Sequence, residues 1–467
     1  MTTEYQKNCP EISSGDAAGR NSSSFYRSAS EAFRFILLAA AVLAVILAFA
    51  SDIDGIVRGY VNFSYPLGCT LVNYSAGFIR RGLLGEIMQF MNVLCQPFLS
   101  MVLLSSGSLL FILGVILCRM IRLRIKPAYI LAIILSPSLI LMQRGENILR
   151  SDAIVLALNI AASCIMLRMG FKAGSSARRI SFAGMLLTDM VIFLMLALSA
   201  LIHELSASLL PTEMLIFLIC AGRVRRTMHA AAVSGLLIIL YAVMMTGFKY
   251  ADPNIIADSW SGIYTDPDSF RYNTALLNTA DKVHAQNCLE MTLTLLKECA
   301  PAYIPQLLLA VAVPFAILLL SGITVFHSSS SRAGKARCLL ILSCLCPLGL
   351  CIAGGDFGRW FSICAINLTA YSLLIAHRAG REYHESNLSD REKAVRVISK
   401  DCTVIAAAVF LLGLRLDVNG YFSESEQPLS EEVREIAANS SNLFRDLKPL
   451  LTREKVLQPQ NGAKKFD

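Results

Sequence analysis

Short polar segments between long apolar runs carry arginine, acidic and histidine side chains at close spacing. Asp52 and Asp54 follow the first apolar run, and the pair His203-Glu204 interrupts a later one. Arginine suits phosphate because its planar guanidinium can donate two charge-assisted hydrogen bonds to it. A carboxylate can act as a general base that accepts the proton of a hydroxyl group. These residue types together favour transfer from a lipid-phosphate-linked donor to a hydroxyl acceptor.

The candidates fall into two groups by residue type. The catalytic candidates are Asp52, Asp54, His203 and Glu204, and the candidates for binding a lipid phosphate or substrate are Arg80, Arg81, Arg144, Arg150, Asp356, Arg359 and Trp360. Each segment also has a purely structural interpretation. Asp52 and Asp54 could mark a membrane interface; Arg144, Glu146, Arg150 and Asp152 could pair within one turn; His203-Glu204 could cap a helix; Asp356 could bind Arg359, with Trp360 as an interface anchor.

The composition indicates which elements must position these groups. Of the 467 residues 55% are hydrophobic and only 16% are charged, whereas soluble proteins carry about a quarter charged residues. The charges are clustered between apolar runs, which predicts an all-α polytopic membrane bundle. The net charge of +8 does not indicate a nucleic-acid-binding domain, because the basic residues form short clusters at the ends of apolar runs.

About eleven spans are predicted in residues 35–415, several of them shorter than the roughly 20 residues that cross a bilayer. They lie near 35–50, 99–118, 127–142, 153–170, 182–202, 206–221, 229–248, 303–326, 338–353, 360–377 and 402–415. Basic clusters near residues 119–126, 168–179, 223–226, 332–337 and 378–396 fall on alternate loops. The positive-inside rule makes that side, and the N-terminus, cytoplasmic. All the candidates above then lie on the opposite side.

The first outer loop, 51–98, is predicted to contain an amphipathic helix from Phe78 to Leu94 that lies in the membrane interface. Arg81 begins its polar face, and Gly82 and Gly85 follow. Glycines weaken a helix, and they are tolerable where another group must approach the backbone closely. The alternative is a purely structural role, as a connecting helix whose arginines reach ordinary lipid headgroups.

Three further regions complete the organisation. Residues 1–34 are predicted to be a disordered cytoplasmic tail; 249–302 is a large outer loop with a helix near Leu289 to Glu298; 416–467 is an extracytoplasmic tail of short helices. Asp189, inside a span, is expected to hydrogen-bond within the bundle. No cysteine spacing indicates a metal site, and Cys69, Cys95, Cys288 and Cys299 in polar loops could pair if those loops face an oxidising compartment.

Four motifs resemble those of bacterial membrane proteins found with surface-polysaccharide genes. They are YSAGFIRRGLLGE at 74–86, LSP at 135–137, HE at 203–204 and DFGRW at 356–360. The general plan is similar to the GT-C glycosyltransferase superfamily. This resemblance implies an inner-membrane enzyme with a polyprenyl-phosphate-sugar donor and a glycan acceptor, a divalent cation in some members, and Asp52 or Asp54 as base. The Asp52-Ile53-Asp54 spacing matches the Asp-x-Asp signature of that superfamily only weakly.

Two other functions remain open on the sequence. A polysaccharide polymerase of the Wzy type would also use outer arginines and a lipid pyrophosphate donor. A flippase for lipid-linked oligosaccharides, or another transporter, would need polar groups deep in the bundle. The charges outside the basic clusters gather at one side apart from Asp189, and no internal repeat is visible, which favours an enzyme.

Overall fold

The computed structural model describes residues 70–78, 81–91, 97–134, 150–174, 182–220, 224–247, 252–261, 311–321, 331–352 and 357–378, with some isolated positions and short strands. These residues form mainly α-helices, as predicted. Two short antiparallel strand pairs were not expected: β1 (Ile323–Thr324) with β2 (His377–Arg378), and β3 (Leu414–Leu416) with β4 (Phe422–Glu424). The strand β3 takes in the last two residues of the span predicted at 402–415, whose other residues lie outside the described part of the chain, and β4 lies in the tail where short helices were predicted.

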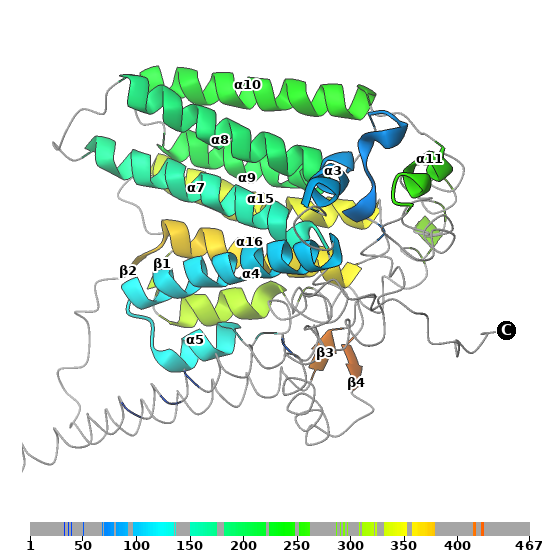
Figure 1. Ribbon diagram of the computed structural model, residues 1–467. Coiled ribbons are helices and arrows are strands. Elements are labelled where there is room, and N and C mark those ends of the chain that lie inside the picture. Colours follow the sequence, from blue (N-terminus) through cyan, green and yellow to red (C-terminus); the bar gives the residue numbers. More distant parts are fainter. Residues whose placement is uncertain are drawn as a thin grey trace, which may run out of the picture.

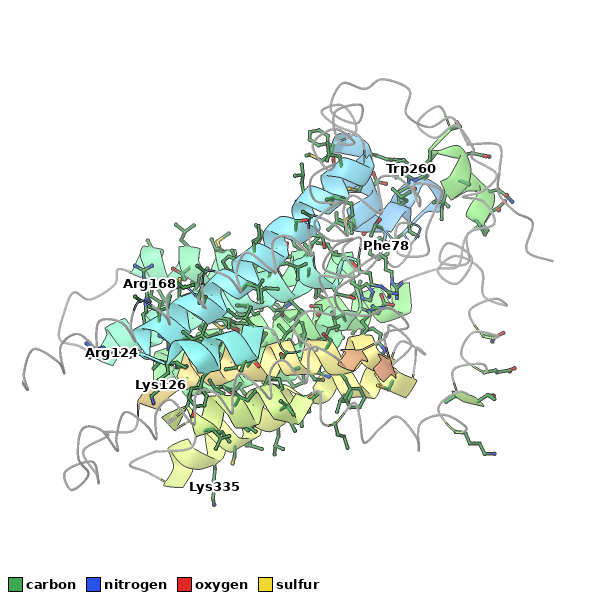
Figure 2. All side chains as sticks on the ribbon, turned by 90° about the horizontal axis from the view of Figure 1, so that it is seen from below. Phe78, Arg124, Lys126, Arg168, Trp260 and Lys335 are labelled. Atoms are coloured by element: carbon green, nitrogen blue, oxygen red, sulfur yellow. The ribbon has the colours of Figure 1, made fainter. Side chains whose placement is uncertain are left out.

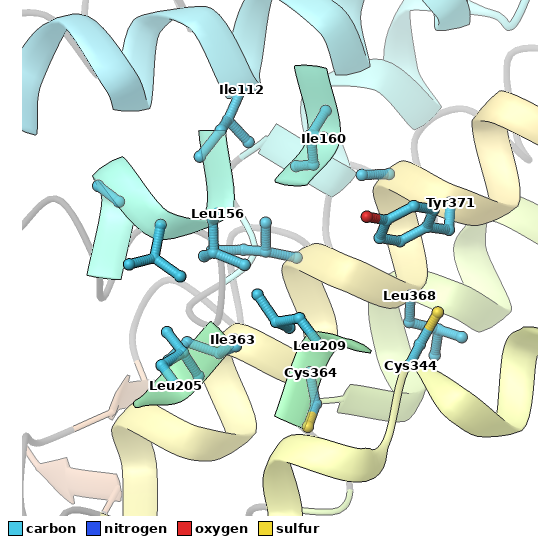
Figure 3. Packing of buried hydrophobic residues seen from close by; sticks show 14 of the residues in the cluster. Ile112, Leu156, Ile160, Leu205, Leu209, Cys344, Ile363, Cys364, Leu368 and Tyr371 are labelled. Atoms are coloured by element: carbon cyan, nitrogen blue, oxygen red, sulfur yellow. The ribbon is translucent and has the colours of Figure 1, made fainter. Parts of the chain in front are cut away.

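The helices form one packed bundle. The long elements are α4 (Pro97–Arg122), α7 (Asp152–Gly174), α8 (Phe182–Ile202), α9 (Leu205–Cys220), α10 (Val224–Gly247) and α16 (Phe357–Ile375). Figure 1 shows them side by side, with α7 in contact with α4, α8 and α9. Figure 3 shows their shared core, in which Ile112 of α4, Leu156 of α7 and Leu209 of α9 are buried.

Prolines begin several helices, because the first helical residue needs no backbone N–H. Pro97 begins α4, Pro127 begins the short α5 (Pro127–Ile134), and Pro253 begins α11 (Pro253–Asp258). Asp252 caps α11 by accepting a hydrogen bond from the backbone N–H of Asn254. The cap and the proline together explain a helix in the outer loop that its polar sequence did not predict.

The closely spaced pair of spans at 182–202 and 206–221 is confirmed as two separate helices. The α-helix α8 ends at Ile202 and α9 begins at Leu205, with Pro211 inside α9. By contrast, the span expected at 338–353 is not one continuous α-helix. Helix α15 (Ser331–Ser343) begins earlier, in the basic segment, and the chain continues as the 3-10 helix η4 (Cys346–Ile352).

The two ends of the bundle differ in chemistry. Figure 2 shows Arg124, Lys126, Arg168 and Lys335 at one end, and Phe78 and Trp260 toward the other. The C-terminal ends of α4 and α16 meet at the basic end, where Arg119 donates hydrogen bonds to the carbonyls of Leu373 and Leu374. The helices α4 and α16 therefore run in the same direction, as the basic clusters that follow both of them in the sequence predict.

At the opposite end, the segment around the predicted amphipathic helix packs on α11. The helix α3 (Gly82–Met91) is shorter than predicted, and the 3-10 helix η1 (Tyr74–Ala76) precedes it. Trp260 Nε1 donates to the carbonyl of Leu71, and Asn73 Nδ2 donates to Ser259 Oγ at 2.7 Å. These hydrogen bonds join two predicted outer loops that are almost 190 positions apart.

The glycines of α3 allow other groups to lie directly against the helix backbone, as expected from the sequence. A Cβ at Gly82 would collide with the ring of Tyr74, and one at Gly85 would collide with the backbone carbonyl of Val72. Both glycines are buried. The side of α3 that was predicted to be polar and open is therefore partly covered by residues 72–74, while Phe90 on the helix is exposed.

Candidate functional site

Arg81 and Glu204 form an ion pair at the end of the bundle opposite the basic clusters. Arg81 Nε donates to Glu204 Oε1 at 3.0 Å and to Oε2 at 2.8 Å, and Nη2 also donates to Oε1. Arg81 directly precedes α3 and has a φ of 65°, in the left-handed region that non-glycine residues seldom adopt. The side chains are 17% and 29% exposed, so solvent and a ligand can reach this pair.

A second ion pair, Asp152 with Arg359, is buried beside the first. Asp152 begins α7, and Arg359 lies in the first turn of α16. Arg359 Nε lies 2.6 Å from Asp152 Oδ2, and Nη2 donates to Oδ1 at 3.1 Å. Burial is the largest influence and would raise the pKa of the Asp152 carboxyl, but Arg359, His203, Arg150 and the hydrogen bond from Arg359 together outweigh it and hold that pKa below its usual value.

Trp360 extends this buried pair. Its ring lies 4.1 Å from the guanidinium carbon of Arg359, which is the geometry of a cation–π contact. Trp360 is only 6% exposed. Its structural interpretation as an interface anchor is therefore wrong, and the tryptophan instead covers one face of the arginine that Asp152 holds.

His203 lies between the two pairs and is 4% exposed. Its Nδ1 accepts a hydrogen bond from the backbone N–H of Leu205 at 2.9 Å, which caps the start of α9. Burial and then the nearby charge of Arg81 lower the pKa of His203 to about 3, so the ring is neutral at physiological pH. A neutral ring with an accepting Nδ1 carries its proton on Nε2. That Nε2 lies 3.4 Å from Arg359 Nη2, which is also a donor.

Arg150 supplies a third guanidinium, and the second buried one, to this end of the bundle. It is 9% exposed, its positive charge further lowers the pKa of Asp152, and its carbonyl accepts a hydrogen bond from Ser105 Oγ of α4 at 3.1 Å. The interpretation of Asp152 as part of an ion-pair turn with its neighbours is wrong, because Asp152 pairs with Arg359, 207 positions away, while Arg144 and Glu146 lie outside the described residues.

The structure thus brings together six of the predicted residues: Arg81, Arg150, His203, Glu204, Arg359 and Trp360. Asp52, Asp54, Arg80, Arg144 and Asp356 lie outside the described residues, as do Cys69, Cys95, Cys288 and Cys299. Asp152 was noted in the sequence only as a member of an ion-pair turn, and its position at the start of a helix on the candidate side could have indicated its role. In the part of the chain that the structure describes, no three His, Cys, Asp or Glu side chains are arranged to hold a metal ion.

Two acidic groups lie further along the helices. Asp189 Oδ2 of α8 lies 3.8 Å from His229 Nδ1 of α10, which is an ion-pair contact within the bundle, while the predicted hydrogen bond of Asp189 stays a prediction. Glu213 of α9 is fully buried. The sequence analysis missed Glu213, although a single carboxyl in an otherwise apolar helix is itself a signal.

The comparisons with known proteins found no relative in which the equivalents of these residues could be identified. No protein-family model, curated protein or solved structure matches the chain.

Proposed function

We propose that the chain is an inner-membrane protein whose bundle of about eleven spans presents the candidate site at the extracytoplasmic face. The helices Leu99–Arg122 and Ala183–Ile202 are long and apolar enough to cross a bilayer. Large apolar side chains on the outer faces of α4, α8 and α10 support lipid contact; among the exposed ones are Leu103, Leu110, Leu187, Met190, Leu194, Ile239 and Val243. The basic end would then be cytoplasmic.

The proposed activity is transfer of a sugar from a polyprenyl-phosphate-linked donor to a hydroxyl of a glycan acceptor, in cell-surface polysaccharide synthesis. The observation that carries it is the partly exposed pair Arg81–Glu204 beside the buried pair Asp152–Arg359. Arg81 is positioned to exchange Glu204 for the donor phosphate, because phosphate and carboxylate compete for the same two-pronged guanidinium. The exchange would free Glu204 beside the bound donor.

The roles of the residues follow from their exposure. Glu204 is the carboxylate that a ligand can reach, so it is the proposed base that takes the acceptor hydroxyl proton. As the acceptor oxygen bonds to the sugar C1, the bond from C1 to the phosphate oxygen breaks. The leaving phosphate keeps the electron pair, and Arg81 stabilises its charge. His203 is buried, and its low pKa of about 3 makes it a poor proton acceptor, so its proposed role is to position other groups and not the catalytic role predicted from sequence.

The donors of His203 and Arg359 also support an anionic substrate. The His203 Nε2–H and Arg359 Nη2 approach to 3.4 Å and cannot bond each other when both donate. A phosphate oxygen placed between them would accept from both. Asp52 and Asp54 remain predicted catalytic residues, and no step of this mechanism passes through a divalent cation.

Lipid-phosphate binding can be tested with the tryptophan of the site. The chain has two tryptophans, so Trp260→Phe leaves Trp360, 4.1 Å from the Arg359 guanidinium, as the only reporter. The protein in nanodiscs is titrated with undecaprenyl phosphate, and with undecaprenol as the uncharged probe. We expect a saturable change in Trp360 emission with the phosphate alone, weakened at least tenfold by Arg81→Ala. The matched control, Arg168→Ala at the opposite end, should bind normally. Equal responses to both probes, or no effect of Arg81→Ala, would contradict the proposal.

The fate of the glycan separates the transferase from its alternatives. A deletion strain complemented with Glu204→Gln should lack one sugar or branch in its surface glycan if the chain is a transferase. A single capped repeat unit would identify the polymerase instead. Finished lipid-linked units that accumulate at the cytoplasmic face would identify the flippase, a transporter function that the deep acidic residue Glu213 favours.

A further inference from the structure

Glu213 lies in the bundle interior, away from the candidate site. It belongs to α9, nine positions after Glu204, which corresponds to about 13 Å along a helix axis. Its side chain is fully buried. A buried carboxyl in a helix bundle is costly unless it is neutral or well paired, so its contacts determine what it can do.

Glu213 contacts two hydroxyl groups that also contact each other. Ser163 Oγ of α7 lies 2.6 Å from Glu213 Oε2, and the Tyr371 hydroxyl of α16 lies 2.5 Å from Oε1. Ser163 Oγ and the Tyr371 hydroxyl are 3.2 Å apart. Figure 3 shows the Tyr371 side chain in the packed core, with Ile160 of α7 and Leu368 of its own helix, α16, nearby. Three helices therefore meet in a closed ring of oxygen atoms.

The number of hydrogens in this ring indicates the charge of Glu213. Three oxygen–oxygen contacts need three hydrogens to be three hydrogen bonds. Ser163 and Tyr371 each supply one. A protonated Glu213 supplies the third by donating to Ser163, which donates to Tyr371, which in turn donates to the other carboxyl oxygen. An ionised Glu213 leaves the ring one hydrogen short.

The surroundings of Glu213 also favour the neutral acid. The titratable groups that act on it electrostatically are the thiols of Cys164 and Cys344 and the phenols of Tyr241 and Tyr371, from α7, α10, α16 and the turn after α15. All four are themselves weak acids that are neutral when protonated. Within the described residues, no arginine, lysine or histidine forms an ion pair with Glu213, in contrast to Asp152 and Glu204.

Polar residues connect this ring with the charged end of the bundle. On α7, Asp152, Asn159 and Ser163 have spacings of seven and four, which place them along one helix face. On α16, Asn367 is one turn before Tyr371 and nearer to Arg359. Asn367 is buried, and its amide nitrogen makes no hydrogen bond within the described part of the chain. Asn159 Nδ2 donates to Ser199 Oγ of α8 at 2.7 Å. We call this series of polar side chains on α7 and α16, between the ring and the charged end, the polar path.

We propose that Ser163, Glu213 and Tyr371 form an intramembrane proton-binding site at the inner end of this polar path. Glu213 carries the bound proton, and the ring of three hydrogen bonds holds it. Loss of the proton would place an unpaired negative charge between α7, α9 and α16. Because α9 begins directly after His203 and Glu204, this site would link the protonation of the bundle interior to the position of the candidate site. The inference stands on the ring geometry and does not depend on the proposed transferase activity.

Infrared difference spectroscopy of the full chain in lipid tests the proton directly. At neutral pH the wild-type spectrum minus that of Glu213→Gln should contain one carbonyl band of a protonated carboxylic acid, which shifts in D₂O. Tyr371→Phe should move this band to higher frequency, because one hydrogen bond to the carbonyl oxygen is lost. The control Glu290→Gln, an exposed glutamate, should leave the band unchanged.

Three results would overturn the proposal. One is the absence of the band from the wild-type protein at neutral pH, and another is its survival in Glu213→Gln. The third is disappearance of the band when sodium chloride replaces choline chloride at constant ionic strength, because the ring would then hold a sodium ion. The Tyr371→Phe measurement remains decisive if Glu213→Gln fails to accumulate, since it perturbs the same carbonyl.

Discussion

Arg81 and Glu204 are 123 positions apart in the sequence, and they form a two-pronged ion pair that joins the start of α3 to the turn between α8 and α9. Each residue lies outside the regular helices: Arg81 directly precedes α3, and Glu204 lies between α8 and α9. The pair is less than one-third exposed on both sides, so it both fixes the two segments and remains accessible. Its strength can therefore be measured separately from its role in binding.

A double-mutant cycle should measure a favourable coupling between Arg81 and Glu204. We expect Arg81→Ala and Glu204→Ala each to destabilise the protein, and the double variant to be less destabilised than the sum of the two, with a coupling of about 1 to 2 kcal/mol. Partial exposure keeps this value below that of a fully buried pair. The measurement is the free energy of unfolding in mixed micelles. Strict additivity would contradict the pairing.

The buried pair Asp152–Arg359 should respond differently from the exposed one. Arg359→Gln leaves the carboxylate of Asp152, which is fully buried, without its main counter-charge, and should cost about 3 to 5 kcal/mol. The double variant Asp152→Asn with Arg359→Gln replaces both charges by amides that can bond each other, and should recover much of this loss. Protein yield in the membrane and unfolding midpoints provide the measurement. A double variant worse than both single variants would contradict this interpretation.

The sequence predicted that the site residues would lie at the same end of the bundle, because this depends only on the direction in which each helix runs. Spans that alternate in direction bring every second loop to the same end, and the positions of Arg81, His203 and Arg359 required only that alternation. The partners could not be predicted in the same way. Which carboxylate meets which arginine depends on the axial offset and rotation of α7 against α16, and neither is encoded in local sequence.

Glu213 and the break after Ser343 show a second limit of sequence reasoning. Hydropathy over a window averages one carboxyl into eleven or more apolar neighbours, so a span looks uniform when its key contact is a single side chain. The stretch 338–353 does carry a local signal of the change from α15 to η4, because Pro347 lacks a backbone N–H and interrupts an α-helix, but its uniform hydropathy conceals that break. The short α11 was missed because a six-residue helix has too few turns to show a period.

The glycines of α3 should differ from those of α4 in their tolerance of alanine. Gly85→Ala places a Cβ against the backbone carbonyl of Val72, which cannot rotate away, and should destabilise the protein by about 1 to 3 kcal/mol. Gly107→Ala is the matched control in helix α4, because no atom lies within 4 Å of its added Cβ. It should be neutral or stabilising, since alanine favours the helix. Thermal unfolding in the same detergent compares the two, and equal tolerance would show that residues 72–73 do not pack on α3.

Acidification should destabilise the protein through His203. Its pKa is about 3 in the folded chain against the usual 6.5 of a solvated histidine, so between these pH values the unfolded chain binds a proton that the folded chain does not. The stabilisation from a neutral His203 is complete above pH 6.5 and falls by about 1.4 kcal/mol per pH unit as the pH drops toward 3. His203→Asn should flatten this slope, because asparagine does not titrate and its side-chain oxygen can still accept from the Leu205 N–H.

The measurement is the unfolding midpoint as a function of pH for wild type, His203→Asn and the control His229→Asn. His229 lies in α10, and its side chain is 31% exposed against 4% for His203. The lowered pKa of Asp152 adds a loss of stability of the same sign at lower pH, and the charge of Arg359, which contributes more to that lowering than His203 does, is present in all three proteins. The difference between wild type and His203→Asn therefore isolates the histidine. A wild-type slope that His203→Asn leaves unchanged would mean that His203 is already protonated in the folded chain, and Arg359 would then face a second positive charge at 3.4 Å.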